Sequence, residues 1–279
     1  MNSNSTSQLL SSLQPDEHFE IQLPAYRRPG EPEHYRLSAA RLAGLSHLER
    51  PLPPPRPIQF WFRTRCLSAM ASQFSDLHPH VLGLRLRPSA AANLIASFVP
   101  LLPSCVQGWI RAIFPEWFLP GYVVMKMRRF GAYKEILDED FDAELKAYRL
   151  MKPIQGLVIP KFFGHVRCNG RRAMILEHLP GIQMSSPEGA TLKMNELAAL
   201  LLPCFRAMHP FRVQYGDANL SNFVLVDGRM MVWDLEDVEF DSSDYDMALS
   251  TKLDIEKLAR RYLSIQANYR FEGLLEAAS

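Results

Sequence analysis

The sequence of 279 residues lacks several features that would point to a particular location or partner. It has no uninterrupted apolar run of about 18 residues, which a membrane-spanning helix requires. The longest candidate, residues 97–124, is broken by four prolines and carries Arg111 and Glu116. The formal net charge is only +1, which gives no sign of nucleic acid or a membrane as partner. The N-terminus lacks a basic stretch followed by an apolar one, so we expect no signal peptide and a cytoplasmic protein.

Cysteine is also scarce. The four cysteines, Cys66, Cys105, Cys168 and Cys204, lie far apart, and none belongs to a CxxC pair or to a Cys/His spacing typical of zinc sites. We therefore expect buried, reduced thiols, as in an intracellular protein.

What is present predicts an α+β protein. Residues 1–20 are polar and Ser-rich, which is typical of disorder, and residues 24–57 are punctuated by proline around one helical patch at 37–49. Beyond them the patterns predict strands at 57–66, 80–88 and 121–129, and helices at 89–102, 138–151, 193–209 and 243–270. Two hairpins are expected, one around Asn169-Gly170 and one around Asp227-Gly228. The first half is rich in strands and the second in helices.

The second hairpin is flanked by side chains that suit phosphate chemistry. Asp217 and Asn222 precede it and Asp234 follows it, so the hairpin would fold Asp234 back beside them. Carboxylate and amide oxygens are hard ligands for Mg²⁺, and a carboxylate can orient an attacking hydroxyl. Upstream, Lys126 lies within an apolar strand pattern, and Glu144, on the following helix, would supply the partner that such a lysine needs.

Each of these residues also has a plain structural interpretation. Lys126 could protect an edge strand against aggregation, and Glu144 could be one more solvated helix charge. Asp217 and Asn222 could be turn and capping residues, and Asp234 could simply close the hairpin.

Several short runs, in this order, carry a resemblance to a known family. They are VVMKM (123–127), FDAELKAY (141–148), IQG (154–156), IPKFFG (159–164), RAMILEHLPG (172–181), GD (216–217), NF (222–223), DGR (227–229) and WDLE (233–236). Over about residues 105 to 250 the chain resembles the protein-kinase-like superfamily, in its aminoglycoside and choline phosphotransferase branch, and more closely a group of fungal kinase-like proteins.

The resemblance implies a role for each matched residue. Lys126 would contact the nucleotide phosphates and Glu144 would position Lys126. Asp217 would be the catalytic base or hydroxyl-orienting group, while Asn222 and Asp234 would bind magnesium. The resemblance thus implies an ATP- and Mg²⁺-dependent phosphotransferase whose acceptor is a hydroxyl of a small molecule or a protein.

The same resemblance implies a two-lobed fold. Residues 57–181 would form an N-lobe with an antiparallel sheet and a helix, and 182–279 a reduced helical C-lobe with a β-hairpin. Residues 1–56 would be a disordered or loop-rich extension. Glu177, His178 and Leu179 would belong to the hinge that meets the adenine.

The sequence departs from the family pattern in two places, and the first of them favours an alternative, a pseudokinase that binds nucleotide or acts as a scaffold without catalysis. The segment 67–79, expected to connect the first two strands, holds no glycine, whereas such a loop normally lays backbone N–H groups on the phosphates. Tyr215 also stands where the family usually has histidine.

Overall fold

A computed structural model describes residues 20–24, 32, 34–38, 52–76, 78–87, 89–131 and 133–278. The chain divides into two compact units. The barrel unit consists of Arg50–Asp138 and Lys161–His178, and the helical unit consists of Met1–Glu49, Glu139–Pro160 and Leu179–Ser279. The expected disorder at residues 1–20 and the helical patch at 37–49 lie almost wholly outside the described residues.

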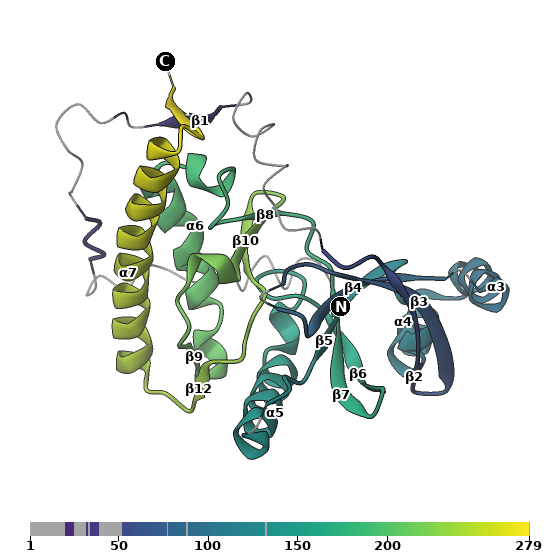
Figure 1. Ribbon diagram of the computed structural model, residues 1–279. Coiled ribbons are helices and arrows are strands. Elements are labelled where there is room, and N and C mark those ends of the chain that lie inside the picture. The colour runs from purple at the N-terminus through teal and green to yellow at the C-terminus, as the bar shows by residue number, and fades with distance from the viewer. Residues whose placement is uncertain are drawn as a thin grey trace. The chain divides into compact units, whose positions relative to one another are not determined.

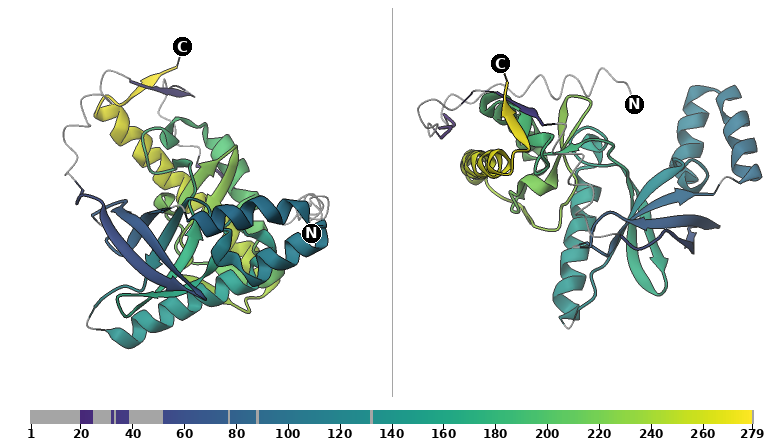
Figure 2. Two further views of the ribbon diagram at one scale, coloured as in Figure 1. Left: turned by 90° about the vertical axis from the view of Figure 1, so that its right-hand side faces the viewer. Right: turned by 45° about the horizontal axis from the view of Figure 1, so that its top comes forward.

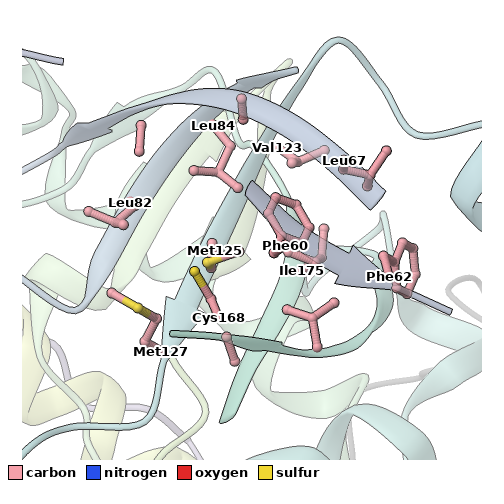
Figure 3. Close-up of a cluster of buried hydrophobic side chains, with 14 residues drawn as sticks. Phe60, Phe62, Leu67, Leu82, Leu84, Val123, Met125, Met127, Cys168 and Ile175 are labelled. Carbon is pink, nitrogen blue, oxygen red and sulfur yellow. The ribbon is translucent and has the colours of Figure 1, made fainter. Parts of the chain in front are cut away.

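Six antiparallel strands form the barrel unit (Figure 1). They are β2 (Arg56–Phe62), β3 (Arg65–Gln73), β4 (Val81–Leu86), β5 (Tyr122–Met127), β6 (Phe162–Cys168) and β7 (Arg171–Glu177). Their order is β2-β3-β4-β5-β7-β6, and the sheet closes where Trp61 of β2 pairs with Arg167 of β6. Alternate residues point inward, and Figure 3 shows Phe60, Leu84, Met125 and Ile175 among the buried side chains of the interior.

The closed barrel contradicts the predicted fold class. We expected a two-lobed kinase-like fold whose N-lobe holds an antiparallel sheet and a helix. Such an N-lobe sheet is open, whereas here β6 pairs with both β7 and β2 and closes the strands into a barrel. This pairing joins segments about a hundred residues apart. Local periodicity carries no information about such a partner, because it reports only which face of a strand is buried.

The start of the barrel also differs from the expectation. The strand predicted at 57–66 ends at Phe62, and Arg63 adopts a left-handed φ of 51° in a tight turn with Thr64. The glycine-free segment 67–79, expected as a connection, supplies most of β3. Leu67, Ala69 and Ala71 face the core, as expected for alternate residues of a strand. Two of the three are alanine, which is a weak strand former, so the pattern did not predict a strand.

A helical hairpin joins β4 to β5. It consists of α3 (Ala90–Phe98), a short turn of 3₁₀ helix at Val99–Leu101, and α4 (Ser104–Ile113). A further 3₁₀ turn, Pro115–Trp117, leads back to the barrel. The right-hand view of Figure 2 shows the two helices next to each other beyond the strands. The predicted helix at 89–102 is thus found, while α4 was not predicted.

The helical unit contains most of α5 (Lys134–Leu150), and all of α6 (Met194–Arg206) and α7 (Asp244–Phe271). Three small sheets accompany them, built from β1 (Tyr35–Leu37) with β13 (Leu275–Ala277), β9 (Val213–Tyr215) with β12 (Val238–Phe240), and β8 (Ile182–Gln183) with β10 (Phe223–Val226) and β11 (Arg229–Val232). No described helix is both long and apolar enough to cross a membrane.

Both predicted hairpin turns are confirmed. Asn169 and Gly170 have φ values of 51° and 76°, and Asp227 and Gly228 have 49° and 75°. Left-handed conformations at both central residues define the turn that matches the twist of a two-residue hairpin, and glycine adopts them without steric cost.

Candidate functional site

The β10–β11 hairpin holds two predicted site residues next to each other in the helical unit. Phe223 pairs with Val232 across the hairpin, and one step beyond, the backbone N–H of Trp233 donates to the carbonyl of Asn222 at 3.1 Å. Asp234 follows directly. The Trp233 indole N–H also donates to the carbonyl of Ser221 at 2.8 Å. Backbone and side chain therefore both fix the segment that carries Asp234 against the loop that carries Asn222.

Asp217 and Asn222 meet through their side chains. The Nδ2 of buried Asn222 donates to the Oδ2 of Asp217 at 2.8 Å and lies 3.3 Å from the backbone carbonyl of Asp217. Asn219 caps the short 3₁₀ turn Leu220–Asn222 between them by accepting from the N–H of Ser221. Since the Asn222 amide nitrogen faces Asp217, its carbonyl oxygen is directed elsewhere. An oxygen in this position is able to serve as a metal ligand.

Three carboxylates gather beside this pair. Oxygen atoms of Glu144, Asp234 and Glu236 all lie within 4.8 Å of one another, which is close enough to share one ion. Glu144 comes from α5 and is only 1% exposed, so it is not a solvated helix charge. The backbone N–H of Glu236 donates to Oδ1 of Asp234 at 3.1 Å. We call Glu144, Asp234 and Glu236 the acidic trio.

Glu236 was not among the predicted ligands. The sequence feature that could have identified Glu236 as a ligand is its position two residues after Asp234 in the run WDLE. The Asp234–Glu236 turn brings both carboxylates to one side, so three negative charges meet where two oxygen ligands, Asn222 and Asp234, had been expected.

Two buried tyrosines line the acidic trio. Burial raises the pKa of the Tyr148 hydroxyl well above its usual value, and the charges of Glu144 and Asp234 raise it further. Burial and the charge of Asp234 likewise raise the pKa of Tyr215, with a smaller contribution from Asp217 and an opposing one from Asn222. Both hydroxyls therefore stay neutral beside the carboxylates. The pKa of Tyr215 is influenced by Asp234 of the acidic trio and by both members of the Asp217–Asn222 pair.

The barrel unit holds the remaining predicted residues. Lys126 is 2% exposed in β5 and pairs with Val81 on one side and Met174 on the other, so it does not lie on an edge strand. Lys126 belongs to the barrel unit and Glu144 to the helical unit, and their predicted ion pair stays a prediction.

The three predicted hinge residues have separate environments. Glu177 accepts from the Nζ of Lys161 at 3.1 Å and from its backbone N–H at 3.1 Å. The ring of His178 contacts Phe74 and Tyr122, and burial lowers the pKa of its imidazole. Leu179 lies in the helical unit, packed against the β10–β11 hairpin. Their role toward adenine stays a prediction.

Comparison with known proteins gave no match to a protein-family model and none to a curated protein.

Proposed function

We propose that the helical unit binds Mg²⁺ together with ATP and that the protein transfers the γ-phosphoryl group to a hydroxyl acceptor. The observation that carries the proposal is the convergence of three carboxylates within 4.8 Å beside a carboxylate, Asp217, that is tethered by a buried amide. Carboxylates this close together attract a cation through their combined charge. Oxygen-only ligand sets are those that Mg²⁺ prefers.

Each residue has a defined task in this proposal. Asp234, Glu236 and Glu144 hold the cation, with the carbonyl oxygen of Asn222 as a further ligand. Asp217, which is exposed, orients the acceptor hydroxyl and accepts its proton as the new oxygen–phosphorus bond forms. Mg²⁺ and ATP, when bound, supply the charge neutralisation and the phosphoryl group. The use of ATP fits a cytoplasmic protein. Lys126 lies in the barrel unit, and its contact with the phosphates stays a prediction.

Binding is tested by thermal unfolding with Mg²⁺ and ATP, separately and together. At about 100 times its Kd a ligand adds roughly 2.7 kcal/mol to the unfolding free energy, which raises the Tm of a chain of this size by several degrees. Glu236→Gln is expected to abolish the Mg²⁺-dependent shift. Glu239→Gln is the matched control, because the same exchange removes an exposed carboxylate three residues away. No shift in the wild type, or equal shifts in both variants, would refute the proposed site.

Transfer is tested separately from binding. Asp217→Asn keeps an oxygen that accepts from Asn222 but cannot take a proton. It is expected to leave the Mg-ATP shift intact and to lower the rate of transfer to an acceptor by a factor of about 10² to 10⁴. The measurement is ADP release in the presence of panels of small-molecule alcohols and of hydroxyl-containing peptides.

A second candidate function is a module that binds the nucleotide without turnover. The observation that favours it is the β2–β3 connection, a tight turn at Arg63–Thr64 without glycine, which offers no flexible loop to lay backbone N–H groups on phosphates. A Mg-ATP shift in the wild type without ADP release over both acceptor panels would select this function over the enzyme.

A further inference from the structure

The two units carry opposite charge. The barrel unit contains 15 Lys or Arg and 5 Asp or Glu residues, a formal charge of +10, whereas the helical unit contains 16 and 25, a formal charge of −9. The expectation of no nucleic-acid or membrane partner depended on the net charge of the whole chain, +1. That sum conceals a strongly basic unit, and the local electric field of this unit attracts anionic partners.

The hairpin α3–α4 presents an unusual number of exposed apolar side chains. Residues 89–115 include a single charged residue, Arg111. Leu94 and Phe98 on α3 are both 60% exposed, Leu101 at the connection is 78% exposed and Trp109 on α4 is 63% exposed. The exposed set also includes Leu102, Val106, Ile113 and Phe114. Isolated exposed apolar residues are ordinary, but eight of them on one supersecondary unit indicate an interaction surface.

Arginines surround the other end of this hairpin, where it joins the barrel. Arg63 in the β2–β3 turn donates from Nη1 to the carbonyl of Ile113 at 2.6 Å. Arg65 stacks over Trp117 at 4.7 Å, and Arg111 lies over the ring of Phe118 at 4.9 Å. Arg87 is exposed immediately before α3 begins. The hairpin is therefore apolar at its connection and around Trp109, whereas its base carries arginines beside Ile113 and Phe114.

The base of the hairpin is held in place by hydrogen bonds to the buried residue Glu116. The hydroxyl of Thr64 donates to Oε1 of Glu116 at 2.7 Å, and Glu116 is only 1% exposed. Nη1 of Arg65 donates to the backbone carbonyl of the same residue at 3.2 Å. These bonds join the β2–β3 turn to the segment that follows α4. The apolar surface is thus fixed on the barrel before any partner arrives, which lowers the entropic cost of docking.

We propose that the hairpin α3–α4 docks the barrel unit on the surface of an anionic lipid membrane. Leu101 and its apolar neighbours enter the boundary between headgroups and acyl chains, Trp109 lies at headgroup depth, and the arginines at the base contact anionic headgroups. This order of apolar, aromatic and basic residues is the order that a membrane interface favours.

Two other occupants fit the surface less well. A protein interface combines an apolar centre with a polar rim and directed hydrogen bonds, whereas charged residues are missing from the exposed end of this hairpin. A second copy of the chain would bring two units of formal charge +10 together, and like charges across an interface oppose pairing.

The test is flotation of the full chain with two kinds of vesicle, one of phosphatidylcholine alone and one that also contains about one third phosphatidylserine. Phosphatidylserine is anionic and gives the second vesicle a negative surface potential. We expect binding to the mixed vesicles that weakens with added salt. Leu101→Ser combined with Trp109→Ser should lower the partition coefficient by on the order of tenfold or more. Arg87→Gln and Arg111→Gln should each lower it about fivefold, and only on anionic vesicles.

Matched control variants remove exposed apolar side chains from the helical unit. Leu253 and Phe271 on α7 are 50% and 95% exposed, and the double variant Leu253→Ser, Phe271→Ser should float like the wild type. Circular dichroism and Tm establish that each variant is folded, since polar substitutions at exposed positions change stability little.

Three results would overturn the proposal. The first is a failure of the folded wild type to float with either vesicle, and the second is an equal loss of flotation in the control variant. The third is self-association in sedimentation velocity that Leu101→Ser, Trp109→Ser abolishes while vesicles are ignored, which would assign the surface to a second copy. None of these readouts involves Mg²⁺ or ATP, so the outcome is independent of the proposed phosphotransfer.

Discussion

The side-chain amide of Asn222 donates a 2.8 Å hydrogen bond to the carboxylate of Asp217. Five residues separate the two along the chain, and a capped 3₁₀ turn closes the loop between them. The bond fixes the orientation of a carboxylate that is otherwise exposed, and it directs the amide carbonyl oxygen away from that carboxylate. Turn formation and site geometry are therefore not alternatives here, because the turn is what creates the geometry.

Replacing Asn222 is expected to affect both stability and metal binding. Asn222→Ala removes a buried side chain and its bond to Asp217, and should lower the unfolding free energy by about 1–2 kcal/mol. Urea unfolding measures this loss, and titration with Mg²⁺ should show weaker binding. Ser221→Ala is the control, since the hydrogen bonds of Ser221 to Gln183, Asn219 and Trp233 use only its backbone. Equal losses in both variants would contradict a specific role for Asn222.

The acidic trio predicts a loss of stability that depends on metal. Asp234→Asn removes one of three carboxylates that lie within 4.8 Å of one another, so its loss of unfolding free energy should be small in EDTA. The asparagine oxygen can still accept from the N–H of Glu236. In saturating Mg²⁺ the same variant should be less stable than the wild type. A variant that is destabilised equally in EDTA and in Mg²⁺ would show that the carboxylates are held together by protein contacts alone.

Tyr215 predicts sensitivity to alkali. Its folded-state pKa is raised above the ordinary 10.0, first by burial and then by Asp234. The unfolded chain therefore loses the phenolic proton near pH 10 while the folded chain keeps it, so this contribution to stability is complete below pH 10 and declines as the pH rises above it. Tyr215→Phe should flatten the fall in Tm between pH 9.5 and 11.5, a range set by the pKa of about 10 in the unfolded chain. Parallel curves for variant and wild type would exclude this origin.

The four thiols should fall into two classes. All are free, with Cys66 and Cys105 exposed and Cys168 and Cys204 buried, which corrects the expectation that all are buried. Burial raises the pKa of Cys204 to about 12 and also raises that of Cys168. Because the thiolate is the reactive form, a disulfide reagent at pH 8 should label Cys66 and Cys105 rapidly in the native protein. The other two should react only after denaturation, and a peptide map identifies each labelled site.

The Thr64–Glu116 bond is expected to stabilise the barrel unit. Thr64→Val keeps the shape of the side chain but removes the donor to a buried carboxylate, and should cost about 1.5–3 kcal/mol. Thr64→Ser retains the hydroxyl and is the matched control, so it should lose far less. The unfolding midpoints of the two variants decide the matter, and indistinguishable midpoints would mean that water satisfies Glu116 in place of Thr64.

Local structure followed from the sequence where a short-range rule applies. Asn169-Gly170 and Asp227-Gly228 form the predicted turns because glycine tolerates left-handed backbone. The apolar spacing of Phe141, Leu145 and Tyr148 on α5 buries all three and places Glu144 on an interior face. Trp61 and Trp109 did not follow the usual burial of large apolar residues, since both are more than 60% exposed. A residue type alone does not reveal which face of its element finds a partner.

What the sequence by itself determined is the two hairpin turns, the helices α5, α6 and α7, and the loop that carries Asp217 and Asn222, because turn chemistry and periodicity act over a few residues. Tertiary structure alone decided three further features: the closure of β2 on β6, the approach of Glu144 to Asp234 and Glu236, and the division of charge between a basic barrel and an acidic helical unit. Each depends on contacts between segments that are distant along the chain. Pairings of this kind depend on the balance between burial of apolar surface and loss of chain entropy over the whole fold. A local sequence pattern therefore does not predict them.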